Sequence, residues 1–130
     1  MIKAKIEIYV VRGGEFSVTP SVGELRIGED GFSVKYYLEG DECVLEVRGG
    51  TIRQRRSGNI SIDMTFREGE MTECRLEEGG RTFVGPVFTR VLGYSLTDDG
   101  CTVTLDYTLG EEGETTEMVF SAKALGSTGL

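Results

Sequence analysis

The sequence predicts an all-β protein, a single antiparallel up-and-down β-barrel of about eight to ten strands. Apolar and polar residues alternate with a period of two along short segments, as in residues 60–66 and 101–107. This period places one set of side chains on each face of a strand. Glycine-rich turns interrupt the segments at spacings of about 8–12 residues, which is typical of sandwiches and barrels. No stretch sustains apolar residues at helical spacing.

Ten segments are predicted to be strands, and tight turns between them imply antiparallel neighbours. In order they are residues 2–11, 22–28, 31–39, 43–48, 51–56, 59–67, 71–77, 82–92, 101–109 and 115–124. Gly49-Gly50 suits a two-residue hairpin, because glycine adopts positive φ without steric cost. Residues 13–23 are the longest gap, and we expect a loop or a short helical turn there. Pro86 removes a backbone donor, so we expect an edge, bulge or bend at that position.

One face of each predicted strand is apolar, which is enough for a single barrel core. The alternation points these side chains inward: Ile6, Ile8, Val10, Leu25, Ile27, Phe32, Val34, Tyr36, Leu38, Leu45, Val47, Ile60, Ile62, Met64, Phe66, Cys101, Val103, Leu105, Tyr107, Met118, Phe120 and Ala122. The cysteines Cys43, Cys74 and Cys101 share this parity, so we expect them to be buried small hydrophobic residues rather than reactive thiols.

The chain is 130 residues long with a net charge of −8. One domain is expected over residues 1–125, followed by a flexible tail over 126–130. The negative charge disfavours nucleic acid and anionic lipid as partners. No apolar run resembles a secretory signal or a membrane span, and three cysteines fit a reducing compartment, so we expect a cytoplasmic protein.

The sequence lacks the residues of common catalytic and metal sites. There is no histidine, so the usual general base and the histidine-based triads and zinc sites are absent, and no phosphate-binding or dinucleotide-binding glycine motif occurs. We therefore expect no enzymatic activity, no metal site and no cofactor. The acidic pairs at turns, such as Asp41-Glu42, are expected to be solvated.

Residues 53–56 form the one local reversal of the negative charge. If Ile52 points inward, Gln54 and Arg56 also point inward, while Arg53 and Arg55 face solvent. An inward arginine near a strand end needs a partner or a ligand. We predict an anion-binding site at the barrel mouth formed by Arg56 and Gln54, with Tyr36 and Tyr107 nearby. The alternative is that carbonyl groups or an acidic partner satisfy Arg56 and that the tyrosines are core aromatics.

The segment from Thr51 to Gly58, the strand 60–66 that follows it, and the glycines at 69, 79 and 80 resemble the YwiB-like family of bacterial proteins of unknown function. Arg56, Gly58, Met64, Phe66 and Gly80 match that family's pattern, whereas residues 74–79 lack its tyrosine. The resemblance covers nearly the whole chain. It implies a calycin-like barrel, related to lipocalins, and implies no activity.

Two functions follow as hypotheses. The first is a non-catalytic binding module that holds a small anionic or amphipathic ligand in the barrel, an argument that rests partly on fold analogy. The second is a protein–protein interaction module that uses the outer surface, where Tyr9 and Tyr37 are exposed by parity, or an open strand edge. Either a monomer or a homodimer is compatible with the sequence. An enzyme that pairs Arg56 with a carboxylate ranks third.

Overall fold

The computed structural model describes residues 1–110 and 113–126, and it is all-β over these residues. Ten strands follow one another along the chain: β1 Ile2–Arg12, β2 Glu15–Ile27, β3 Gly31–Leu38, β4 Asp41–Arg48, β5 Thr51–Ser57, β6 Ile60–Arg67, β7 Met71–Glu78, β8 Arg81–Thr97, β9 Gly100–Leu109 and β10 Thr115–Ala124. Each strand pairs with its sequence neighbours in antiparallel fashion, and β1 pairs with β10 to close the barrel. The predicted fold class is confirmed. Apart from Gly126, the predicted flexible tail lies outside the described residues.

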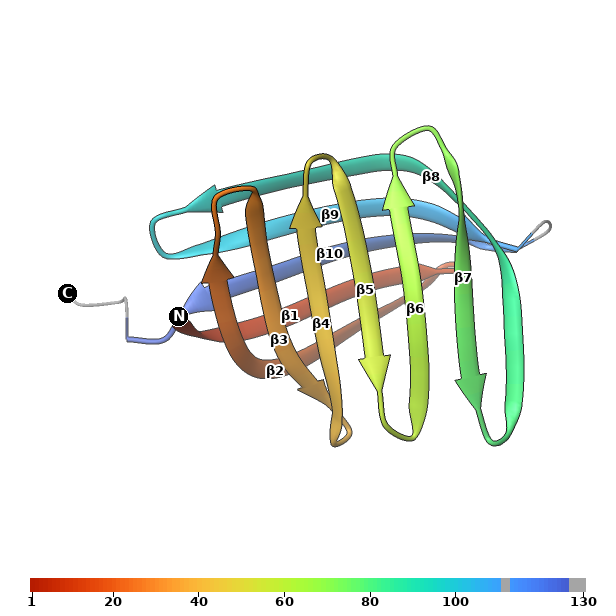
Figure 1. Cartoon of the computed structure of the whole chain (residues 1–130), viewed down its shortest axis with the longest axis horizontal. Coiled ribbons are helices and arrows are strands. Elements are labelled where there is room, and N and C mark those ends of the chain that lie inside the picture. Colours follow the sequence, from red (N-terminus) through yellow and green to blue (C-terminus); the bar gives the residue numbers. More distant parts are fainter. Residues whose placement is uncertain (111–112, 127–130) are drawn as a thin grey trace.

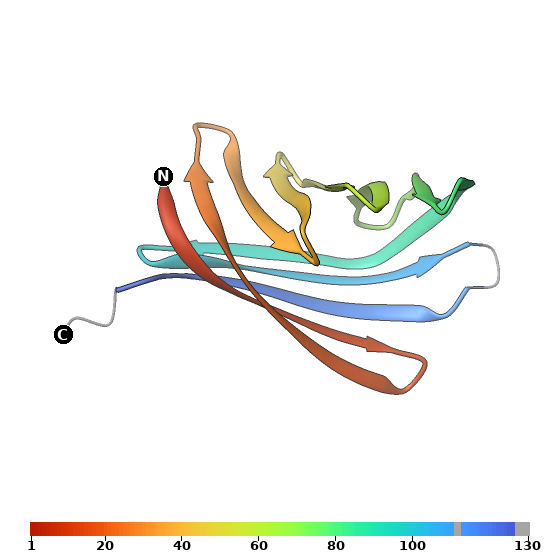
Figure 2. The ribbon, with the colours of Figure 1, turned by 90° about the horizontal axis from the view of Figure 1, so that it is seen from below.

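The barrel is flattened into two layers whose strands cross at a large angle. Figure 1 shows β3 to β7 upright across the front, with β8, β9, β10 and β1 running crosswise behind them. Figure 2 shows the two layers from the side. The long strands β2 and β8 each begin in one layer and end in the other, which is how orthogonally packed sheets make their corners.

Each corner has a local cause in the sequence. In β2 the bend lies near Gly23, where an added Cβ would stand 2.0 Å from the Lys35 carbonyl oxygen, so the β2 and β3 backbones approach closely. In β8 the pairing register with β9 shifts between Thr89 and Val91. Pro86 lies just before this bulge. The predicted interruption around Pro86 is therefore present.

Side chains from the two layers fill the interior. The ring centroids of Tyr36 and Phe120 are 5.2 Å apart, and those of Phe66 and Tyr107 are 4.9 Å apart. Each pair joins strands that are not neighbours in the barrel order, so the rings meet across the interior. Apart from Ile27 and Ile60, the predicted inward side chains form one core or pack against it, and the three cysteines are buried in it.

Two sequence predictions about β2 are wrong. Residues 15–22 are a strand, not a loop: this half of β2 pairs with β1, and Pro20 is tolerated because its ladder with β3 begins only at Gly23. Ile27 has inward parity but is 54% exposed. It is the last residue of β2, at the rim of the barrel, where the opposite layer no longer covers it.

Candidate functional site

Three of the four predicted site residues lie together. Arg56 on β5 stands opposite Cys43 on β4, which in turn stands opposite Tyr36 on β3. The Tyr36 hydroxyl shares a hydrogen bond with the Gln54 side chain. Burial is the main reason that the pKa of Tyr36 lies far above its ordinary value, so the hydroxyl stays neutral.

The guanidinium group of Arg56 already has partners within the protein. Its Nε donates to Asp41 Oδ2 at 2.9 Å, and its Nη2 donates to the Leu38 carbonyl oxygen at 3.4 Å. The Arg56 side chain is 13% exposed and that of Asp41 is 3% exposed. This is the arrangement of the alternative stated above, in which an acidic partner and a carbonyl group satisfy the inward arginine.

Asp41 is the centre of this cluster. Its Oδ1 accepts a hydrogen bond from the Asn59 amide at 2.8 Å, and its Oδ2 accepts one from the Ile60 amide at 3.1 Å. These two bonds, followed by Arg56, hold the pKa of Asp41 below its ordinary value against the opposing effect of desolvation. A Cβ at Gly58 would lie 2.0 Å from Asp41 Oδ1, so only glycine fits beside this carboxylate. The expectation that Asp41 is a solvated turn residue is wrong.

Tyr107 belongs to a different part of the interior. Its hydroxyl shares hydrogen bonds with Arg12 and Thr116, and Arg12 Nε donates to Thr116 Oγ1 at 3.0 Å. Its ring packs on Phe66. The structure therefore brings Arg56, Gln54 and Tyr36 together and places Tyr107 with other partners, in an interior that is filled by packed side chains.

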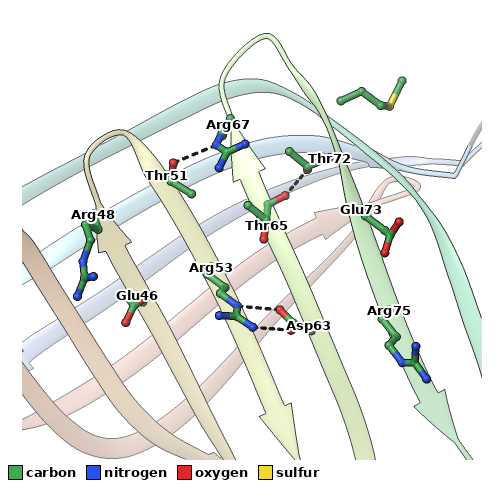
Figure 3. Close-up of a pocket in the computed structure, with 11 residues that line it drawn as sticks. Glu46, Arg48, Thr51, Arg53, Asp63, Thr65, Arg67, Thr72, Glu73 and Arg75 are labelled. Carbon is green, nitrogen blue, oxygen red and sulfur yellow. Dashed lines mark hydrogen bonds and ion pairs between the residues drawn. The ribbon is translucent and has the colours of Figure 1, made fainter.

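A groove of about 700 Å³ lies outside the barrel, across β4 to β7. We call it the arginine groove, and its lining consists of Glu46, Arg48, Thr51, Arg53, Asp63, Thr65, Arg67, Met71, Thr72, Glu73 and Arg75. Figure 3 shows these side chains on the outer face of the sheet. They gather there because outward positions on adjacent strands stand opposite one another, as Glu46 does with Arg53 and Arg53 with Thr65.

Two arginines that line the groove form ion pairs with carboxylates. Arg53 donates to both oxygens of Asp63, from Nε at 3.0 Å and from Nη2 at 2.7 Å. This hydrogen-bonded pair raises the pKa of Arg53 and lowers the pKa of Asp63. Arg75 makes two bonds to Glu77 Oε1, at 3.1 and 2.9 Å. The Arg53–Asp63 pair joins neighbouring strands, which is an ordinary feature of exposed sheet faces, whereas Arg75 and Glu77 lie on the same strand.

Two other arginines of the groove have no carboxylate partner within the described residues. Arg48, Thr51 and Arg67 stand opposite one another on β4, β5 and β6, and form one row across the groove. Arg67 Nε donates to Thr51 Oγ1 at 3.2 Å, and neither Arg48 nor Arg67 lies within 4.0 Å of an acidic oxygen (Figure 3). Figure 3 shows the Arg48 side chain extending away from Thr51, so the two guanidinium groups share one row of the sheet without converging on the hydroxyl, and each is a planar donor suited to a phosphate or carboxylate group.

The sequence did not predict this groove. The outward direction of Arg53 followed from the parity of β5. Arg48 and Arg67 lie 19 positions apart in the chain, and only the register of three strands brings them into one row. The alternation along β4 and β6 predicts that both arginine side chains point outward, but it does not predict which residues of other strands lie beside them.

The three thiols are protected from reaction. Cys43, Cys74 and Cys101 are buried, and desolvation raises the pKa of each; for Cys101 the pKa rises to about 11. A nucleophilic cysteine needs the opposite setting, exposed and with a lowered pKa.

Comparison with known proteins shows the family. Residues 6–120 match the domain of unknown function DUF1934. The chain belongs to the DUF1934 family. The crystal structure of the ywiB protein from Bacillus subtilis superposes on this DUF1934 chain with a TM-score of 0.79. The match covers 95% of this chain and 90% of the ywiB chain at 16% sequence identity, and at that identity it shows a shared fold. No match was found among the curated proteins.

Two further observations concern the described part of this DUF1934 protein. No helix in residues 1–110 and 113–126 has the length and apolar character needed to cross a membrane. In the same ranges, no group of three or more cysteine or carboxylate side chains is arranged to hold a metal ion.

Proposed function

We propose that this DUF1934 protein is a non-catalytic binding module of the cytoplasm that holds a small anionic ligand, and that the ligand sits in the arginine groove. The observation that carries the proposal is the row Arg48–Thr51–Arg67 on the outer face of the barrel. Its two guanidinium groups have no acidic partner within the described residues, although the protein as a whole has a net charge of −8.

The barrel interior is less suited to a ligand than the arginine groove. Aromatic rings from opposite layers meet in it, with centroid distances of 4.9 and 5.2 Å. A ligand there would displace packed apolar side chains, and it would also compete with Asp41 for Arg56. The groove is open to solvent and needs no such rearrangement.

The chemistry of the groove favours a small anion over a nucleic acid. Arg48 and Arg67 provide planar, bidentate donors that match a phosphate or carboxylate group. Glu46, Asp63 and Glu73 line the same groove, and the whole protein is acidic, so a long polyanion would meet repulsion around the two arginines. Because the groove is exposed to solvent, we expect a modest affinity that weakens with added salt.

The absence of catalysis is part of the same proposal. The chain has no histidine, and burial keeps its three thiols protonated at neutral pH. The carboxylates Asp41 and Asp63 are each engaged with an arginine. Binding therefore needs only groups that the groove displays, whereas catalysis would need a base that none of these groups supplies.

The first test is native mass spectrometry of freshly purified protein, followed by titration with inorganic phosphate, pyrophosphate and citrate observed by backbone-amide NMR. We expect a retained mass, or amide shifts confined to the outer rows of β4 to β6. The double variant Arg48→Gln/Arg67→Gln should lose the signal. The matched double variant Arg81→Gln/Arg90→Gln removes two exposed arginines of β8, away from the groove, and should keep it.

A third variant separates the two locations for the ligand. Arg56→Gln removes the arginine at the barrel end and leaves the groove intact. Loss of binding in this variant alone would contradict the groove and favour the interior site of Arg56, Gln54 and Tyr36. Equal binding by all variants, or no retained mass and no amide shift with any of the three anions, would refute the proposal.

A further inference from the structure

The first half of β2 reverses the usual alternation of a barrel strand. In residues 15–22 the apolar side chains point outward and the polar ones have inward parity. Phe16 is 65% exposed, Val22 is 59% exposed, and Val18 and Pro20 are exposed between them. Elsewhere in the barrel the inward-facing apolar residues form the buried core, and the largest group of other exposed apolar side chains lies on β8.

This outward row continues across two further strands. Phe16 stands opposite Val11 on β1, and Val18 stands opposite Tyr9, whose ring packs on Phe16 with centroids 6.4 Å apart. Tyr9 in turn stands opposite the exposed Val119 on β10. We call the outer surface of β2 residues 16–22, β1 and β10 the β2 face; these three strands lie side by side in Figure 1. A contiguous exposed apolar surface of this kind is typical of an interface.

The charges around the β2 face have opposite signs at its two ends. Glu117 stands opposite Val11, at the Phe16 end of the face. Lys123 stands opposite Lys5, which is opposite Val22, at the other end. Glu117 and Lys123 are both exposed, both on β10 and six residues apart.

We infer that the β2 face binds a second copy of this chain, face to face about a two-fold axis that crosses the strands between the Tyr9 and Glu7 positions. Such an axis reverses the strand direction and keeps each strand opposite its own counterpart. It brings Phe16 of one copy onto Val22 of the other and Val18 onto Pro20. It also brings Glu117 onto Lys123, so acid meets base on β10, while on β1 it places Tyr9 opposite Glu7 and Val11 opposite Lys5. An axis along the central strand β1 would instead place β10 on β2, and so Lys123 against Val22.

The free edge of β2 is not the contact in this arrangement. Residues 15–22 pair with β1 but not with β3, so one edge of the backbone is open. Pro20 lies in the middle of that edge and has no N–H to donate, which is a common device against strand addition. The open edge therefore remains hydrated while the face is covered.

The test is sedimentation velocity of the full chain from about 10 to 500 µM, a range that spans weak self-association. We expect a reversible dimer. Val18→Asp should weaken it at least about tenfold, because it buries a charge at the centre of the face. Val84→Asp is the matched control: Val84 is also exposed and apolar but lies on β8, so the dimer should persist. Circular dichroism checks that each variant is folded.

The charges give a second, independent readout. Glu117→Lys and Lys123→Glu should each weaken the dimer, and the double swap Glu117→Lys/Lys123→Glu should restore it, because the two-fold axis then pairs the exchanged charges again. A monomer at all concentrations would overturn the inference. Equal effects of Val18→Asp and Val84→Asp on the dimer would also overturn it. So would new hydrogen-exchange protection of the Phe16 and Val18 amides in a dimer that the double swap does not restore, because that result indicates strand addition.

Discussion

At the scale of single residues, Asp41 shows how a turn residue becomes structural. The sequence places it in an acidic pair after Gly40, a pattern typical of solvated turns. In the fold its carboxylate accepts bonds from two backbone amides of the β5–β6 turn and from Arg56, so it ties two neighbouring hairpins together. No local pattern reveals this, because the partners lie 15 to 19 residues away.

The depressed pKa of Asp41 predicts a loss of stability in acid. Between the folded pKa and the ordinary carboxyl value of about 3.9 the unfolded chain binds a proton that the folded chain does not. This contribution to the free energy of unfolding is therefore present above about pH 4 and is lost as the pH falls through the folded pKa. We expect Asp41→Asn to be less stable at pH 7 and to show a flatter pH dependence between about pH 5 and 2.

Urea unfolding at a series of pH values measures both effects. The control is Asp98→Asn, which removes an exposed acidic residue from another turn and should follow the wild type. Parallel pH curves for the wild type and Asp41→Asn would contradict the prediction.

Burial of Cys101 predicts a loss of stability in alkali. Its pKa of about 11 exceeds the value of 9.0 for a free thiol. The unfolded chain therefore releases this proton first, and stability falls as the pH rises from about 9 to 11. Labelling of the native protein with a maleimide, followed by mass spectrometry, should be at least about 100-fold slower than labelling in urea. Rapid labelling of Cys101 without urea would show that the thiol is accessible.

At the scale of elements, β2 and β8 are where sequence-based prediction is least complete. Eight segments follow a single alternation and were located to within about two residues. β2 and β8 serve both layers, so their alternation is interrupted at the corner. Pro20 and the length of the gap suggested a loop or a short helical turn in residues 13–23, because a strand is usually recognised by its buried apolar face. The apolar residues at positions 16, 18 and 22 do follow the two-residue period of a strand, but their side chains point away from the core.

The close backbone approach at Gly23 predicts that a larger residue there disrupts the β2 corner. Its added Cβ would meet the Lys35 carbonyl oxygen at 2.0 Å and the Ile6 side chain at 2.9 Å. Gly23→Ala should therefore force β2 away from β3 and lower the free energy of unfolding by roughly 2–3 kcal/mol. Gly93→Ala is the matched control, since nothing lies within 4 Å of its Cβ position on β8. Hydrogen exchange should locate the damage in the β2–β3 ladder, and uniform loss of protection would argue against a local corner effect.

At the scale of the whole molecule, the sequence predicted a barrel, but not whether its interior is open. Alternation identifies which side chains point inward and cannot give the distance between opposite walls. That distance depends on how far the barrel is flattened, and here the two layers lie close enough for rings to touch across it. The predicted site residues Arg56 and Tyr36 were placed correctly on inward faces. Their immediate partners depended on strand register, as did the row of Arg48 and Arg67.

A filled interior predicts a large penalty for truncating a ring at its centre. Phe120 is fully buried and contacts Tyr36 from the opposite layer. Phe120→Ala should lower the free energy of unfolding by about 3–5 kcal/mol, because it removes the buried ring and leaves a cavity. Chemical denaturation measures the loss. A decrease below about 1 kcal/mol would mean that the ring lines an open space instead of packing against its neighbours.

Closure of the barrel between β1 and β10 also constrains how the protein is made. The Leu125 amide donates to the Lys3 carbonyl oxygen at 2.9 Å, so residues from the two ends of the chain complete the same sheet. On the ribosome, β1 can pair with β2 early, but its other edge stays uncovered until β10 has emerged. Contacts of such long sequence separation form slowly. During that interval the nascent chain presents an open strand edge, the part of a β protein that aggregates most readily and that a chaperone would need to shield.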